Sequence, residues 1–182
     1  DTVTISAAAR SACAESNQCS NSEVAERLDE TNLIDMEDFD YLYTHDSKFA
    51  AIHDKAVKSP DGAIGALTSS ELDYHQKALG LVNTMAYLST DEKQLYDKLV
   101  SEGNTAAVRG LDNIALIRLG LGTMAGGSAG TPYDSTNTPI SSETIRKYFS
   151  HSVDNSTGQI AAAQLYALAQ YLQINPMYKG ID

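Results

Sequence analysis

The chain has few of the residues that nucleic-acid and membrane binding require. Its 182 residues contain 13 Lys and Arg against 24 Asp and Glu, which gives a formal net charge of −11. Phosphate binding needs clustered cations, so neither nucleic acid nor an anionic membrane surface is an expected partner. No apolar run approaches the roughly 18 residues of a membrane span. Cations and basic protein partners fit this composition better.

Cysteine is scarce as well, with two residues in the chain. Cys13 and Cys19 stand together in the polar stretch SACAESNQCS. This spacing favours a short disulfide loop in an oxidising compartment over two free thiols in a reducing one. The first residue is Asp1 rather than Met, so either a signal peptide has been removed or the chain is an excised fragment. The cysteines favour the first alternative, and we expect a secreted or periplasmic protein of bacterial origin.

Several catalytic signatures are missing as well. The chain has no Gly-x-Ser-x-Gly elbow, and its Gly-rich run at 126–130 lacks the Lys and strand context of a phosphate loop. Segment 35–75 offers one alternative form of catalysis, a metal site, because histidines and aspartates suit a transition metal that activates water. The candidate ligands are His45-Asp46, His53-Asp54, Asp73 and His75.

Helix geometry limits this metal alternative. On one unbroken helix, His45 and His53 would lie about 12 Å apart, too far for one small site. A solvated helix face with scattered histidines is therefore favoured. Enzymatic activity is left open, with a non-enzymatic role preferred.

Helical signals are abundant. Ser-x-x-Glu or similar capping boxes mark helix starts at 20–23, 68–71 and 89–92. The second helix is expected to reach Leu88, and the Pro and Gly residues of 59–65 predict a loop. Further helices are expected at 105–125, 141–151 and 159–173, and the broadly apolar 105–125 should be buried. With no strand-rich region, the sequence predicts an all-α fold.

Two short helices are expected between the first and second capping boxes. One should be lined by Met36, Phe39 and Leu42, and the other by Phe49, Ile52 and Val57. The expected organisation has three parts. Residues 1–20 form an arm with the disulfide, 21–125 a main helical domain, and 126–182 a helical pair after a Gly-rich loop.

Four segments share part of one loop pattern. Each has a polar turn, then an apolar residue, then an oxygen-bearing residue at the start of a helix: 27–38, 60–71, 133–144 and 153–164. This pattern resembles the calcium loops of the EF-hand superfamily. The resemblance implies a helical bundle of helix–loop–helix units, with an EF-hand-like pair over 21–80. The turn residues match better than the ligands do.

The first loop is the best candidate for Ca²⁺. The resemblance implies four ligands with oxygen-bearing side chains, namely Asp29, Thr31, Asp35 and Asp38. Arg27 stands where the first carboxylate belongs and would repel the ion.

Such degenerate units usually serve as packing and interaction modules. We therefore expect a structural or protein-interaction role with a protein partner. The alternatives are a metal-dependent enzyme or bacterial effector that uses 35–75, and a true calcium-binding module.

Overall fold

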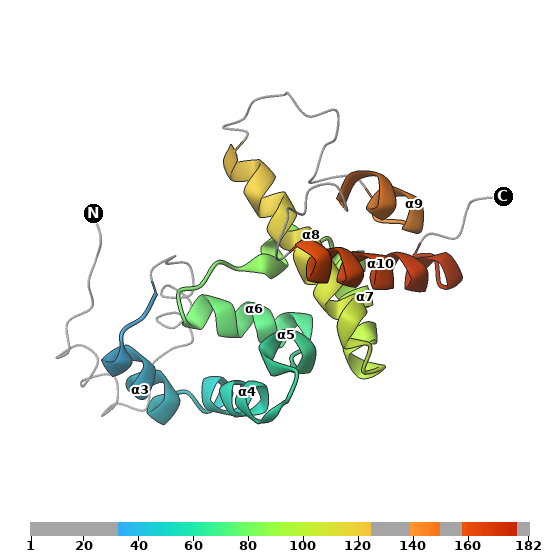
Figure 1. Ribbon diagram of the computed structural model, residues 1–182. Helices are drawn as coiled ribbons and strands as arrows, with labels where there is room; N and C mark the ends of the chain where they lie inside the picture. The colour runs from blue at the N-terminus through green and yellow to red at the C-terminus, as the bar shows by residue number, and fades with distance from the viewer. Residues whose placement is uncertain (1–32, 125–138, 150–157, 178–182) are drawn as a thin grey trace. The chain divides into compact units, whose positions relative to one another are not determined.

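The computed structural model describes residues 33–124, 139–149 and 158–177 (Figure 1). Every regular element in these ranges is helical, which confirms the all-α class; the EF-hand-like arrangement stays a prediction. The elements are α3 (Met36–His45), α4 (Ser47–Lys58), α5 (Gly62–Ala66), α6 (Ser69–Ala78), the 3-10 helix η1 (Thr84–Tyr87), α7 (Thr90–Ser101), α8 (Thr105–Met124), α9 (Ser142–Thr144), the π-helix η2 (Ile145–Phe149) and α10 (Gly158–Ile174).

The chain divides into two compact units. Among the described residues, unit 1 holds 33–53 and 74–82, and unit 2 holds 54–73 together with everything from Asn83 onward. Helices α4 and α6 therefore contribute residues to both units. The core of unit 1 consists of Leu42, Phe49 and Ala78, with Ile34, Phe39, Tyr74 and Leu79 packed against it. Helices α8 and α10, which the sequence assigned to different domains, both belong to unit 2.

Two of the expected capping boxes are present. The Ser89 hydroxyl accepts from the Glu92 amide, and the Glu92 carboxylate accepts from the Ser89 amide at 2.8 Å. Thr68 and Glu71 form the same reciprocal pair at the start of α6. The box at 20–23 lies outside the described residues. Helix α7 buries Leu95, Tyr96 and Leu99, and the predicted capping box placed its start correctly.

The prediction that α6 reaches Leu88 is wrong. Helix α6 ends at Ala78, because Gly80 adopts a left-handed φ of 69°. The Gly80 amide then bonds to the Lys77 carbonyl and the Leu81 amide to the Gln76 carbonyl, a Schellman ending that satisfies carbonyls left over by the helix. A separate 3-10 turn, η1, follows.

The predicted loop over 59–65 is only partly correct. Residues 59–61 form the turn, but α5 begins at Gly62 and runs to Ala66. Two predicted inward side chains are also exposed, Met36 by 73% and Val57 by 69%. In α4 the buried stripe runs through Phe49, Ile52 and Ala56, which is the i, i+3, i+7 spacing of one helix face. Val57 lies one residue beyond that face.

Helix α10 packs closely on the buried helix α8 (Figure 1). Val108, Leu111 and Ile114 of α8 are fully buried, as expected from their apolar pattern. The Asn113 amide donates to the Gln164 side chain at 2.8 Å. A Cβ at Gly110 would lie only 2.4 Å from the Gln164 carbonyl oxygen. Gly110 therefore sets how closely the two helices approach.

We predict that Gly110→Ala destabilises the protein, although alanine is the better helix former. Overpacking against the rigid α10 backbone should cost about 1–3 kcal/mol, which outweighs the gain of up to about 1 kcal/mol in helix propensity. Denaturant unfolding measures the difference. Ala163→Gly, at an exposed position inside α10, is the control for propensity alone. A more stable Gly110→Ala protein would contradict the close approach.

Candidate functional site

The predicted calcium ligands divide between described and undescribed residues. Asp35 caps α3, and its Oδ1 accepts from the Asp38 amide at 2.8 Å. Asp29 and Thr31 lie outside the described residues, as do Cys13 and Cys19. Within the described ranges, no three His, Cys, Asp or Glu side chains converge as metal ligands. The calcium site and the disulfide therefore stay predictions.

The second predicted calcium loop, 60–71, has a different local structure from an open loop. Helix α5 occupies 62–66, where the pattern would place the early ligands. The Tyr96 hydroxyl donates to the Ile64 carbonyl at 2.9 Å, and the Arg109 guanidinium donates to the Asp61 carbonyl at 2.8 Å. These oxygens hold α5 within unit 2.

The structure brings together two of the predicted transition-metal ligands, His53 and His75. His53 Nδ1 of α4 lies 3.1 Å from His75 Nε2 of α6. The helix is interrupted at Asp46, between α3 and α4, as a shared site of His45 and His53 would require. His45 nevertheless lies apart from this pair in its contacts: its ring stacks on Tyr41, and its Nδ1 lies 2.9 Å from the Tyr41 carbonyl oxygen. Asp73 accepts instead from the Asn83 amide at 2.6 Å.

Aromatic rings hold the two imidazoles in place. We call the set Phe39, Tyr43, Phe49, His53 and His75 the aromatic–histidine cluster. The Phe49 ring stacks near both imidazoles, with centroids 5.8 Å from His53 and 5.9 Å from His75. The edge of Phe39 meets His53 at 4.8 Å, and Tyr43 meets it at 6.1 Å. These contacts fix the ring orientations, so the facing nitrogens are positioned before any ligand arrives.

The apolar surroundings favour the neutral form of His75. Burial lowers the pKa of the His75 ring, and the charge of a protonated His53 lowers it further. Next to His75, the Tyr74 hydroxyl donates to the Asp46 carboxylate, and burial together with this bond raises the pKa of Tyr74. Lys48 lies over the Tyr74 ring at 4.3 Å. The two neutral imidazoles can share one proton between their facing nitrogens, whereas an added proton would place a positive charge among the aromatic rings.

The sequence named both histidines as candidate ligands of one metal site but favoured a solvated helix face, so the direct contact of His53 with His75, 22 residues apart, was not predicted. One signal was available. His75 follows Leu72 by three residues and precedes Ala78 by three, and all three side chains are buried. A histidine on the apolar stripe of a helix needs a polar partner in the core. The stripe on α4, through Phe49 and Ile52, was the place to look for it.

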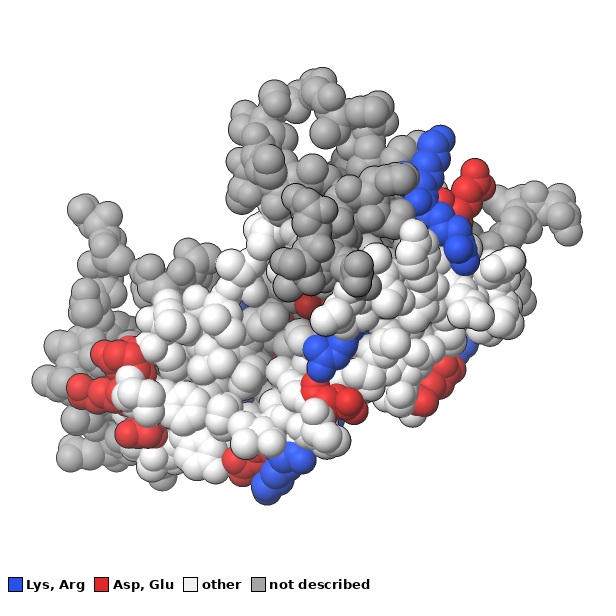
Figure 2. All heavy atoms as spheres, viewed as in Figure 1, with Lys and Arg blue, Asp and Glu red and all other residues white. Residues whose placement is uncertain are grey.

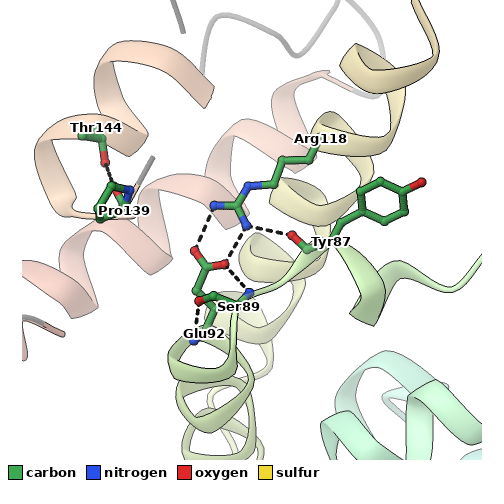
Figure 3. Close-up of polar contacts among 6 residues, drawn as sticks. All are labelled: Tyr87, Ser89, Glu92, Arg118, Pro139 and Thr144. Atoms are coloured by element: carbon green, nitrogen blue, oxygen red, sulfur yellow. Dashed lines mark hydrogen bonds and ion pairs between the residues drawn. The ribbon is translucent and has the colours of Figure 1, made fainter. Parts of the chain in front are cut away.

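Unit 2 contains a second buried polar cluster, which Figure 3 shows. Arg118 of α8 donates from Nη1 to Glu92 Oε1 at 2.6 Å and from Nη2 to Glu92 Oε2 at 2.9 Å. Nη1 also donates to the Tyr87 carbonyl oxygen at 2.8 Å. Both charged side chains are nearly inaccessible, with 2% and 3% exposure. Each group here bonds to another part of the same unit, which indicates a structural role.

A second buried acid lies on helix α8. Asp112 accepts from the Thr84 hydroxyl at 3.0 Å. Burial raises the pKa of Asp112, while the bond from Thr84 and the charge of Arg109 act in the opposite direction. The pair ties η1 to α8.

No protein family, curated protein or solved structure gives a significant match to this chain. The EF-hand resemblance therefore stays a prediction. Among the helices described, none combines the length and the apolar character that crossing a bilayer requires.

We predict that unit 1 loses stability as the solution is acidified. The fold holds the pKa of His75 below its ordinary value of 6.5, so the unfolded chain binds more protons between the two values. The His75 contribution is complete above about pH 6.5 and declines as the pH falls through that value toward the folded pKa. Thermal melting from about pH 7.5 to about pH 5 measures this slope.

The control for the pH experiment uses the exposed histidine of α3. His75→Gln should flatten the slope, whereas His45→Gln should leave it unchanged. An unaltered slope in His75→Gln would show that other groups cause the acid sensitivity.

We predict that Arg118→Met destabilises the protein strongly. The substitution leaves the Glu92 carboxylate buried without its main partner, which should cost about 3–5 kcal/mol. The double variant Arg118→Met/Glu92→Leu should lose less than the sum of the two single variants. Denaturant unfolding of all four proteins gives the coupling energy.

A matched pair elsewhere tests whether burial is the cause. Lys55 and Glu71 also form an ion pair at 2.8 Å, but their side chains are 49% and 25% exposed. Lys55→Met should therefore cost at most about 1 kcal/mol. Equal costs for Arg118→Met and Lys55→Met would contradict the argument.

Proposed function

We propose that this chain is a secreted or periplasmic protein-interaction module, in which α3 docks a basic, amphipathic segment of a partner protein. One observation carries the proposal: α3 presents apolar side chains to solvent among acidic ones. Met36 and Tyr43 are exposed by 73% and 41%, and Asp40 lies between them on the same helical face. Leu33, just before the helix, is exposed by 73%.

The charge of this surface supports the choice of partner. Residues 33–46 contain no Lys or Arg, and their acids are Asp35, Glu37, Asp38, Asp40 and Asp46. Figure 2 shows acidic side chains gathered over the α3 end of unit 1. The helix dipole favours acids in the first turn, which accounts for Glu37 and Asp38 but not for Asp40. A single-sign field of this kind speeds the encounter with a cationic partner.

The apolar residues define the rest of the partner's chemistry. Burial of water-exposed Met and Leu side chains under a partner is favourable and stabilises the complex. Met is also flexible and adapts to differently shaped partners. A segment that pairs Lys or Arg with apolar residues at helical spacing would meet both features of this surface. The proposed location is supported by the spacing of Cys13 and Cys19.

We predict that the full chain binds a dye-labelled amphipathic peptide of Leu and Lys, followed by fluorescence anisotropy. Asp40→Lys should weaken binding about fivefold or more, equivalent to about 1 kcal/mol. Met36→Ser should weaken it comparably, because part of the apolar contact is lost. Both experiments are run with a chelator, so that calcium does not compete for the acids.

The controls match each change in charge and polarity. Asp91→Lys, exposed on α7, makes the same change in net charge, and Ile160→Ser removes an apolar side chain that is exposed by 67% on α10. Neither should alter the affinity by more than about twofold. Equal binding of a peptide with the same composition in scrambled order would reduce the interaction to non-specific charge attraction. Equal loss in Asp91→Lys would place the contact elsewhere.

A further inference from the structure

We propose that His53 and His75 together bind a divalent transition-metal ion, Zn²⁺ or Cu²⁺, through the two ring nitrogens that face each other in unit 1. His53 Nδ1 and His75 Nε2 lie 3.1 Å apart. Two nitrogens bound to tetrahedral zinc at 2.0–2.1 Å are separated by about 3.3 Å. The separation of the facing nitrogens thus already lies within a few tenths of an ångström of the one that the ion requires.

The binding step replaces a proton by the metal. In the bridged pair, one facing nitrogen carries the shared proton and the other accepts it. Metal binding requires both lone pairs, so the proton moves to an outer ring nitrogen, His53 Nε2 or His75 Nδ1. Both imidazoles stay neutral in this exchange, which suits the apolar surroundings of the aromatic–histidine cluster.

The cluster also lowers the entropic cost of binding. His53 and His75 lie on different helices, and Phe49 stacks near both rings. Phe39 and Tyr43 restrict His53 from the α3 side, and His75 is only 7% exposed. Side chains held by packing lose little further freedom when a ligand arrives.

The ligand set determines which ions fit. Imidazole nitrogen suits Zn²⁺ and Cu²⁺, whereas Ca²⁺ and Mg²⁺ require oxygen ligands. Because no third His, Cys, Asp or Glu of the described residues completes the site, water fills the remaining positions. Two protein ligands should hold the ion more weakly than the three or four of known zinc sites. This site uses inward side chains of unit 1 and does not depend on the proposed docking surface of α3.

The experiment is a calorimetric titration of the full chain with ZnCl₂ at about pH 7.5, where unbound imidazole is mostly neutral. One equivalent should bind, and His53→Gln or His75→Gln should weaken the affinity at least tenfold. His45→Gln and His151→Gln, which alter the two other histidines of the chain, should change it less than twofold. CaCl₂ should not compete. No saturable binding, or equal binding by all variants, would overturn the proposal.

A second measurement avoids dependence on variants that fail to fold. In the unaltered chain, zinc should shift the ring NMR signals of two histidines and leave the other two in place. Bound Cu²⁺ should show two coordinating nitrogens in its electron paramagnetic resonance spectrum. Shifts of all four histidines, or of none, would also overturn the proposal.

Discussion

The bidentate ion pair between Arg118 and Glu92 is the interaction on which unit 2 depends. It joins the middle of α8 to the first turn of α7, and through the Tyr87 carbonyl it also fixes η1. Glu92 serves the capping box of α7 at the same time, because its Oε1 accepts from the Ser89 amide. The start of α7 therefore cannot shift along α8 without exposing a buried charge or losing a helix cap. Such a network specifies one arrangement more strongly than apolar packing alone.

In unit 1, the buried His75 side chain is paired with another imidazole instead of with an opposite charge. One of the buried polar side chains of this unit, His75, meets a second imidazole rather than a carboxylate, among the rings of Phe39, Tyr43 and Phe49. A neutral pair avoids the desolvation penalty of an ion pair but keeps a lone pair and a transferable proton within the core. Buried histidines of this kind respond to pH and to metals in a way that Arg118 and Glu92 do not. The two units therefore differ in chemical sensitivity as well as in composition.

The sequence predicted what is decided locally. A capping box lies within a few positions of the helix start that it sets, so the start of α7 followed from the sequence. The end of α6 did not, because apolar residues continue beyond Gly80 and hide the left-handed turn. The Arg118–Glu92 pair spans 26 residues and the His53–His75 pair 22. Local spacing does not show which distant polar residue a buried one will meet. The sequence therefore did not predict the first contact, and it only listed the two histidines of the second among the candidate ligands of one site.

Two side-chain contacts link helices α4 and α6, and they differ in exposure and in their dependence on protonation. In unit 2, Lys55 bonds to Glu71; burial alone would raise the pKa of Glu71, but the bonds from Lys55 and Thr68 lower it. This ion pair is half exposed and contributes little to stability. In unit 1, the link is the His53–His75 contact, whose strength depends on protonation.

The same unit 1 link touches the proposed docking helix. Phe39 packs against His53 from α3 and stacks on the partly exposed Tyr43 at 6.1 Å. A second proton or a metal ion at the histidine pair would change the electrostatic environment of His53, which Phe39 meets edge-on. Tyr43 also contacts His53 directly, with ring centroids 6.1 Å apart, so the effect would reach this exposed ring without an intervening residue. Coupling between the two proposed sites thus needs no long pathway, because a single aromatic side chain contacts both.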